Sequence, residues 1–164
     1  MACGVREDQG QAFNWQLAVV DMLPVAFFGL ATFVLGGRLG SASFSLGALL
    51  CLLAGAGKVL WKLLIALWGR DVSVLGAQLR FLMPAGFLLM AIGAATADQE
   101  AANQLLAAAA RPPSAVCFAL TLVGMCAMIF CARRFDRYDV RGNWIEQGIN
   151  AVAQGCLLLG VLFL

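Results

Sequence analysis

Five long apolar segments run through the chain, and they constrain its fold more than any other feature. They lie at 15–39, 43–69, 74–97, 114–135 and 143–164. A helix needs about 20 mostly apolar residues to cross the hydrocarbon core of a bilayer, and each segment meets that length. We therefore expect an all-α integral membrane protein, a bundle of five transmembrane helices that forms a single polytopic membrane domain over residues 1–164.

The composition leads to the same expectation. Apolar residues make up 62% of the chain and charged residues 12%, whereas a soluble domain is typically about half apolar and about a quarter charged. Beyond five spans, the 164 residues provide only short connections and no room for a separate soluble domain. The formal net charge of +2 is too balanced to indicate a nucleic-acid partner.

Several kinds of chemistry are excluded or disfavoured by the residue types present. The chain contains no histidine, which excludes histidine-ligated metals and haem as well as Ser-His and Cys-His catalysis. The six cysteines form no C-x-x-C motif, and five of them lie in apolar segments, where cysteine commonly serves as a small packing residue. No P-loop and no evident nucleophile with a neighbouring base occur either. We expect no catalytic residue, no metal and no cofactor, and hence no enzyme.

Basic residues near the ends of the segments predict the topology. Six arginines lie on the inner side and two on the outer side if the amino terminus is cytoplasmic: Arg6, Arg70, Arg133, Arg134, Arg137 and Arg141 against Arg38 and Arg111. Cytoplasmic connections carry an excess of Lys and Arg, so we expect a plasma (inner) membrane protein with a cytoplasmic amino terminus and an external carboxyl terminus. The first segment is long and contains Asp21 and Pro24, so we expect it to be retained and not cleaved as a signal peptide.

The longest polar connection joins the third and fourth segments, at 98–113. Asp98 can cap a short alanine-rich helix, and Pro112 must end it. We therefore expect a short amphipathic helix on the external surface, between the third and fourth transmembrane helices.

Five charged residues inside the segments are the main candidates for function. At 1.5 Å per residue from the inner boundary, Lys58 lies about 16 Å deep, Lys62 about 10 Å, Asp21 and Arg80 about 9 Å, and Glu146 about 5 Å. Side chains near a boundary can extend to the interface, whereas Lys58 lies close to the midplane and needs a polar partner.

Two helical stripes carry most of the polar residues. Gly47, Cys51, Gly55, Lys58 and Lys62 fall within an arc of about 80°. We expect this first stripe to face protein, either another helix of the same chain or a second copy, because small residues allow close helix approach. Asn143, Glu146, Gln147, Asn150 and Gln154 fall within an arc of about 100°. These side chains can hydrogen-bond neighbouring helices or form the polar wall of a binding cavity.

Asp21 and Arg80 each lie on an otherwise apolar face, so both are expected to point inward. Each is followed closely by a proline, and the segment 76–86 around Pro84 is the strongest candidate for a non-ideal helix that lines a site. If all five charges meet, three cations face two carboxylates, and an anionic ligand would balance the excess positive charge. In the alternative arrangement, Lys58 pairs with Asp21 or Glu146, Lys62 and Arg80 reach interfacial phosphates, and nothing binds.

The sequence thus predicts a small transporter, channel or membrane substrate-binding subunit for a small anionic solute or a lipid head group. The expected binding residues are Asp21, Lys58, Lys62, Arg80, Glu146, Asn150 and Gln154. One alternative is a scaffold or accessory subunit whose polar stripes only pack helices, and another is a membrane enzyme acting on a lipid-linked substrate. Expected partners are membrane lipids and either a second copy or a larger membrane complex, because five spans without an internal repeat are few for a complete carrier.

Overall fold

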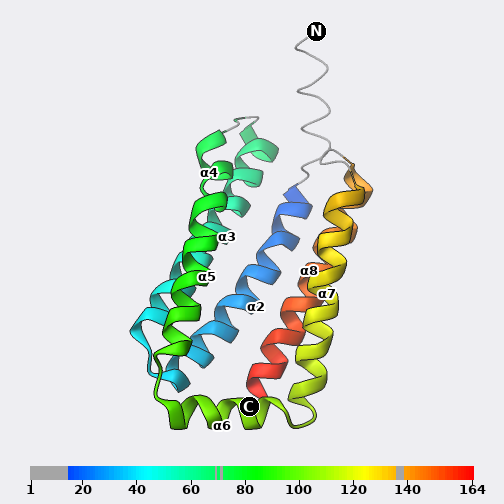
Figure 1. The fold of residues 1–164 in the computed structure, drawn as a ribbon. Coiled ribbons are helices and arrows are strands. Elements are labelled where there is room, and N and C mark those ends of the chain that lie inside the picture. The colour runs from blue at the N-terminus through cyan, green and yellow to red at the C-terminus, as the bar shows by residue number, and fades with distance from the viewer. Residues whose placement is uncertain (1–14, 69, 71, 136–138) are drawn as a thin grey trace.

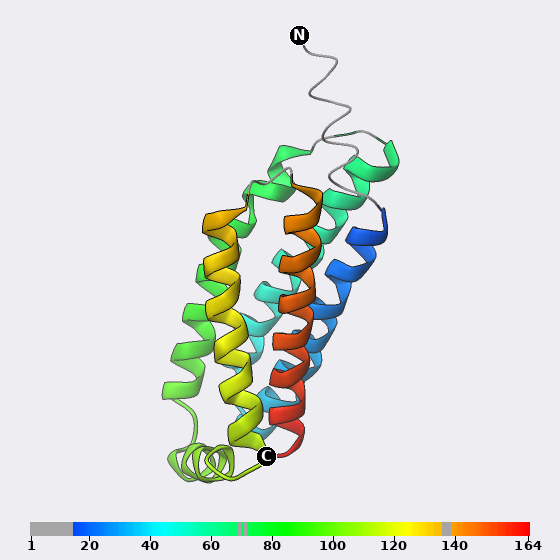
Figure 2. The ribbon, with the colours of Figure 1, turned by 90° about the vertical axis from the view of Figure 1, so that its right-hand side faces the viewer.

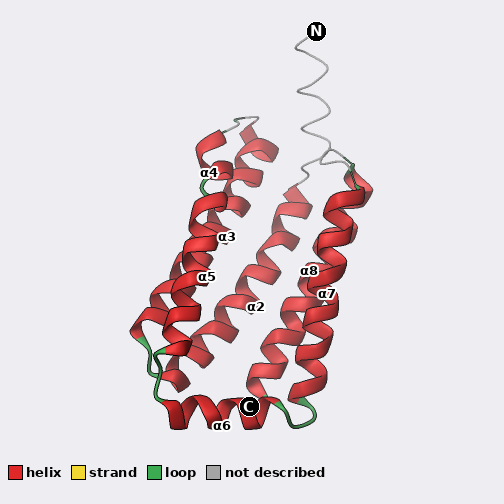
Figure 3. Ribbon diagram, viewed as in Figure 1, coloured by secondary structure: helices red, strands yellow, loops and turns green. Residues whose placement is uncertain are grey.

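The computed structural model describes residues 15–68, 70, 72–135 and 139–164, and this part of the chain is helical, with no strand (Figure 3). Among the described residues, five helices are long and apolar enough to cross a membrane. The helices are α2 (Trp15–Leu39), α3 (Ala42–Trp68), α4 (Ser73–Ala77), α5 (Leu79–Ala95), α6 (Gln99–Ala109), α7 (Ser114–Arg134) and α8 (Val140–Leu162).

The long helices pack side by side with α2 at the centre. Helix α2 packs against α3 on one side and α8 on the other, α5 packs against α3, and α7 packs against α8 (Figures 1 and 2). Helices α2 and α8 begin, and α3 ends, at the top of Figure 1, which we call the upper end. Helix α6 crosses the opposite end, where it contacts α7 and α2.

The helix boundaries follow the sequence expectation closely, with two informative differences. Helix α8 begins at Val140, three residues before the expected start, because the Asp139 carboxylate accepts a hydrogen bond from the Arg141 backbone N–H at 3.1 Å and caps the helix within the charged connection. The third segment is divided into α4 and α5 at Gln78. This division lies inside the 76–86 segment that was predicted to be non-ideal.

The short helix between the third and fourth segments is confirmed. Helix α6 spans Gln99–Ala109, and the Asp98 carboxylate accepts a hydrogen bond from the Ala101 backbone N–H at 3.0 Å. Its placement outside a membrane stays a prediction. Two of the basic residues used for the topology, Arg6 and Arg137, lie outside the described residues.

Glycines allow α3 and α5 to approach until their backbones touch. A Cβ added at Gly47 would lie 2.5 Å from the Gly86 carbonyl oxygen, and a Cβ at Gly86 would lie 2.5 Å from the Cys51 Sγ. Further along α3, a Cβ at Gly55 would lie 3.0 Å from Val25 of α2. The small-residue stripe is therefore covered by α5 and α2 of the same chain, which confirms that it faces protein.

The outward faces of the helices carry large apolar side chains. Phe33 of α2 is 82% exposed, Phe81 of α5 is 75% exposed and Leu122 of α7 is 68% exposed. A soluble monomer seldom exposes apolar patches of more than a few hundred Å². A molecule with this surface needs an apolar environment or a partner around it.

The α3–α5 contact generates a stability prediction. Gly86→Ala forces a methyl group into backbone atoms of α3, so we expect the free energy of unfolding to fall by about 1–3 kcal/mol. Gly148→Ala on α8 is the matched control, because a Cβ there would meet nothing within 4 Å. Thermal melting in one detergent measures both variants, and equal melting temperatures would contradict the close packing.

Candidate functional site

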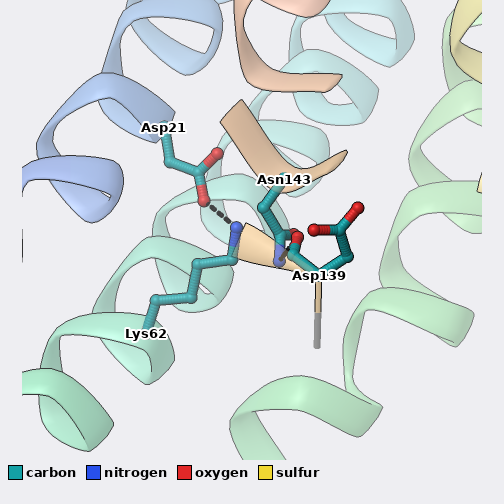
Figure 4. Close-up of polar contacts among 4 residues, drawn as sticks. All are labelled: Asp21, Lys62, Asp139 and Asn143. Carbon is teal, nitrogen blue, oxygen red and sulfur yellow. Dashed lines mark hydrogen bonds and ion pairs between the residues drawn. The ribbon is translucent and has the colours of Figure 1, made fainter. Parts of the chain in front are cut away.

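A buried ion pair joins α2 to α3 near the upper end. The Lys62 Nζ contacts the Asp21 Oδ2, and the two residues are each 4% exposed (Figure 4). It is the one ion pair found among the described residues. Burying a single charge costs several kcal/mol, whereas a paired charge recovers part of that cost through attraction to its partner. The pair therefore explains how both charges are tolerated inside the helix packing.

The close contact of α2 with α3 positions the pair. Val25, one turn after Asp21, lies against Gly55, and Leu52 fills the space beside Gly29, where an added Cβ would lie 2.7 Å from the Leu52 Cδ2. Asp21 lies on the buried face of α2 together with Leu17 and Thr32. This packing directs the Asp21 carboxylate toward α3.

The pairing corrects one sequence expectation. The alternative arrangement assigned Lys58 to Asp21 or Glu146 and sent Lys62 to the interface. In the structure Lys62 is the buried residue that pairs with Asp21, and Lys58, one turn earlier on α3, is half-buried. The register between α2 and α3, which the sequence does not specify, places the Asp21 carboxylate opposite Lys62.

Lys58 of α3 and Glu146 of α8 are the other two charged candidates on the helices that pack against α2. Glu146 projects from α8 and, like Lys58, is half-buried. Neither residue forms an ion pair or a hydrogen bond with another described residue. Among the described residues, this part of the bundle thus holds one buried ion pair and two further charges of opposite sign that form no ion pair.

The amide stripe of α8 continues from this charged group. Asp139 and Asn143, at the start of α8, appear beside the ion pair in Figure 4, and the Asn143 side chain donates to the Asp139 carbonyl at 3.1 Å. Gln147 is buried and Asn150 is half-buried, and neither hydrogen-bonds another described residue. At these two positions the stripe therefore forms no hydrogen bond with a described residue of another helix.

Gln154 lies further from the charges and faces α7. Its Nε2 lies 3.8 Å from the Met125 Sδ, and its Oε1 is buried without a hydrogen-bond partner among the described residues. In the same region, the Thr121 hydroxyl of α7 donates to the Ala153 carbonyl at 3.2 Å. Thr121 holds α7 against α8 and was not singled out from the sequence, where one threonine in an apolar run carries no pattern.

Arg80 is separate from the other candidate residues. Its side chain is exposed, and no ion pair joins it to a described residue. It shares a face of α5 with Phe87, which is 50% exposed and whose ring meets the Phe28 ring edge-on at 6.2 Å between centroids. Arg80 was expected to point inward, and this expectation is wrong. The face of α5 that packs on α3 is the glycine face, with Gly86 and Gly93. Without Arg80, two cations balance two carboxylates.

Neither a metal-binding group nor a similar protein indicates what the chain does. Within the described part of the chain, no group of three or more Cys, Asp or Glu residues is placed to hold a metal ion. No protein-family model, curated protein or solved structure matches the chain.

The ion pair predicts different effects for the two neighbouring lysines. Lys62→Met leaves the Asp21 carboxylate buried and unpaired, so we expect a loss of about 3–5 kcal/mol in the free energy of unfolding, partly restored by Asp21→Asn in the same chain. Lys58→Met should cost much less. Melting of the single and double variants in one detergent tests this, and a larger loss for Lys58→Met that Asp21→Asn rescues would show that the pairing is wrong.

Proposed function

We propose that the chain is a multi-pass protein of the plasma (inner) membrane, with its amino terminus in the cytoplasm. Five apolar helices of spanning length and the exposed apolar side chains around them support insertion. The excess of basic residues at the upper end supports this orientation. On this topology, the ion pair and the residues around it lie in the cytoplasmic half of the membrane.

Orientation is tested by labelling single cysteines with a membrane-impermeant maleimide. Arg141→Cys at the upper end and Gln104→Cys on α6 are both exposed positions. In intact cells we expect labelling at position 104 and none at position 141 until the membrane is permeabilised. The reverse pattern would invert the topology and place the charged group in the external half.

We further propose that the protein is a small transporter, channel or membrane substrate-binding subunit that takes an anionic group of a solute or lipid head group at Lys58. Lys58 is half-buried and forms no ion pair or hydrogen bond with a described residue, while Lys62 contacts Asp21. An ammonium group in such a position gains from charge-assisted hydrogen bonds to a carboxylate or phosphate. Asn150, which hydrogen-bonds no described residue, supports an orienting role for the amides.

A scaffold or accessory subunit is the second candidate, and two observations favour it. Asp21 and Lys62 neutralise each other, and the small-residue stripe is used in packing within the chain. A scaffold needs only these contacts, and its polar residues would bind no solute.

Thermal-shift measurements separate the two candidates. A binding subunit should be stabilised by inorganic phosphate or acetate in a saturable manner at constant ionic strength, because a ligand that binds only the folded state raises the melting temperature. Lys58→Gln should remove most of this shift, whereas Arg111→Gln, an exposed arginine near the opposite end, should keep it. The absence of a saturable shift with any solute or lipid would support the scaffold.

A further inference from the structure

Three amide side chains, those of Gln147, Asn150 and Gln154, follow one face of α8 within an arc of about 60°. We call these three residues the amide track. We propose that the track holds a file of water molecules that leads from the upper end of the bundle toward the middle of the membrane. This inference goes beyond the anion at Lys58 and rests only on the proposed insertion into a membrane.

Contacts on either side of Gln154 place the track between two neighbouring helices. A Cβ added at Gly124 of α7 would lie 2.6 Å from the Ala153 Cβ, and a Cβ at Gly155 would lie 3.6 Å from the Phe27 ring of α2. Successive residues of a helix point about 100° apart. With α7 on the side of Ala153 and α2 on the side of Gly155, Gln154 points between these two helices.

Burial shows that this side of α8 is the enclosed one. Val152 points away from Gln154 by about 200° and is 68% exposed, whereas Gln147 on the track is 3% exposed. Asn150 is half-buried, so part of its side chain meets open space although it lies on the same face as Gln147. The track therefore faces the inside of the bundle, and the opposite face of α8 carries the exposed apolar side chains.

The described part of the chain supplies the track with few hydrogen bonds. The Gln154 Oε1 is buried without a partner, and its Nε2 reaches only the Met125 Sδ, a weak acceptor, at 3.8 Å. Gln147 and Asn150 hydrogen-bond no described residue. A polar group that stays unsatisfied in hydrocarbon is costly, so three amides on one inward face need partners from outside the chain.

Water suits these amides better than an anion does. Each amide has an oxygen that accepts and an NH2 group that donates, and water can bind both. An anion only accepts, so it would leave the buried Gln154 Oε1 without a donor. Buried water typically makes about three hydrogen bonds to otherwise unsatisfied groups. Between Gln147 and Gln154 the helix rises about 10 Å, which is enough for a short file.

The position of the track gives the file a direction across the membrane. Gln147 lies about 10 Å and Gln154 about 21 Å along the axis from Val140, where α8 begins at the upper end. On the proposed topology the file starts on the cytoplasmic side. A polar solute would then reach the middle of the membrane along water and amides without entering the lipid.

Hydroxyl-radical footprinting of the wild-type protein in lipid nanodiscs tests the file without any substitution. Radicals formed from water oxidise methionine sulfur nearby. Met125 reports on the track through its contact with Gln154, and Met22 of α2 is the matched reference, because the two methionines are 41% and 53% exposed. We expect Met125 to be oxidised about fivefold faster than Met22, because hydrocarbon holds no water. Met22 lies nearer the upper end than Met125, so depth alone predicts the opposite order.

Cysteine substitution compares the two faces of α8 at nearly one depth. Asn150→Cys places a thiol on the track and Val152→Cys places one on the exposed apolar face. Methanethiosulfonates react with the thiolate, which forms in water and not in lipid, so we expect Asn150→Cys to react about tenfold faster. Peptide mass spectrometry separates both positions from the native cysteines.

Equal rates within both pairs would overturn the water file. Slow reaction of both methionines and both thiols would do so and leave membrane insertion intact, whereas fast reaction of all four would contradict insertion as well. The methionine pair decides the question if Asn150→Cys does not fold.

Discussion

Charge burial is the constraint on which the arrangement of this protein depends. A helix packed on both sides can keep a carboxylate only where a neighbouring helix supplies a cation, and α2 does so through Asp21 and Lys62 of α3. This pair fixes how α2 and α3 face each other at the upper end. The pair also determines which lysine can contact a ligand, because Lys62 already contacts Asp21. Lys58 takes its proposed role from this one contact.

Small residues provide the close approach that such a contact requires. Gly55 brings α3 against Val25 of α2, and Gly47 and Gly86 bring α3 against α5. Between α7 and α8 the same device recurs, since a Cβ at Gly124 would lie 2.6 Å from the Ala153 Cβ. The hydrophobic effect contributes little to helix association within lipid, so van der Waals contacts between closely packed helices and a few polar contacts hold them together. The large apolar side chains remain on the outside, where they suit a lipid environment.

Sequence patterns predicted those features that depend on one helix at a time. The lengths of the apolar segments, the Asp98 cap of α6 and the protein-facing stripe of α3 each follow from local composition or from helical periodicity. The sequence did not predict which lysine pairs with Asp21. Lys58 and Lys62 lie one turn apart on the same stripe, and the register between α2 and α3 selects one of them. Arg80 is a second example. Helical periodicity grouped it with Phe87 on one face of α5, but it did not predict that the glycine face would be the one that packs on α3. Contacts between helices depend on packing that no single segment encodes.

A density map of the purified protein in lipid nanodiscs would show whether Lys62 pairs with Asp21 and whether Lys58 holds a ligand. We expect the Lys62 ammonium to contact the Asp21 carboxylate and non-protein density to lie against the Lys58 ammonium. A map in which Lys58 is paired directly with Glu146 or Asp21, with no non-protein density beside it, would contradict this arrangement.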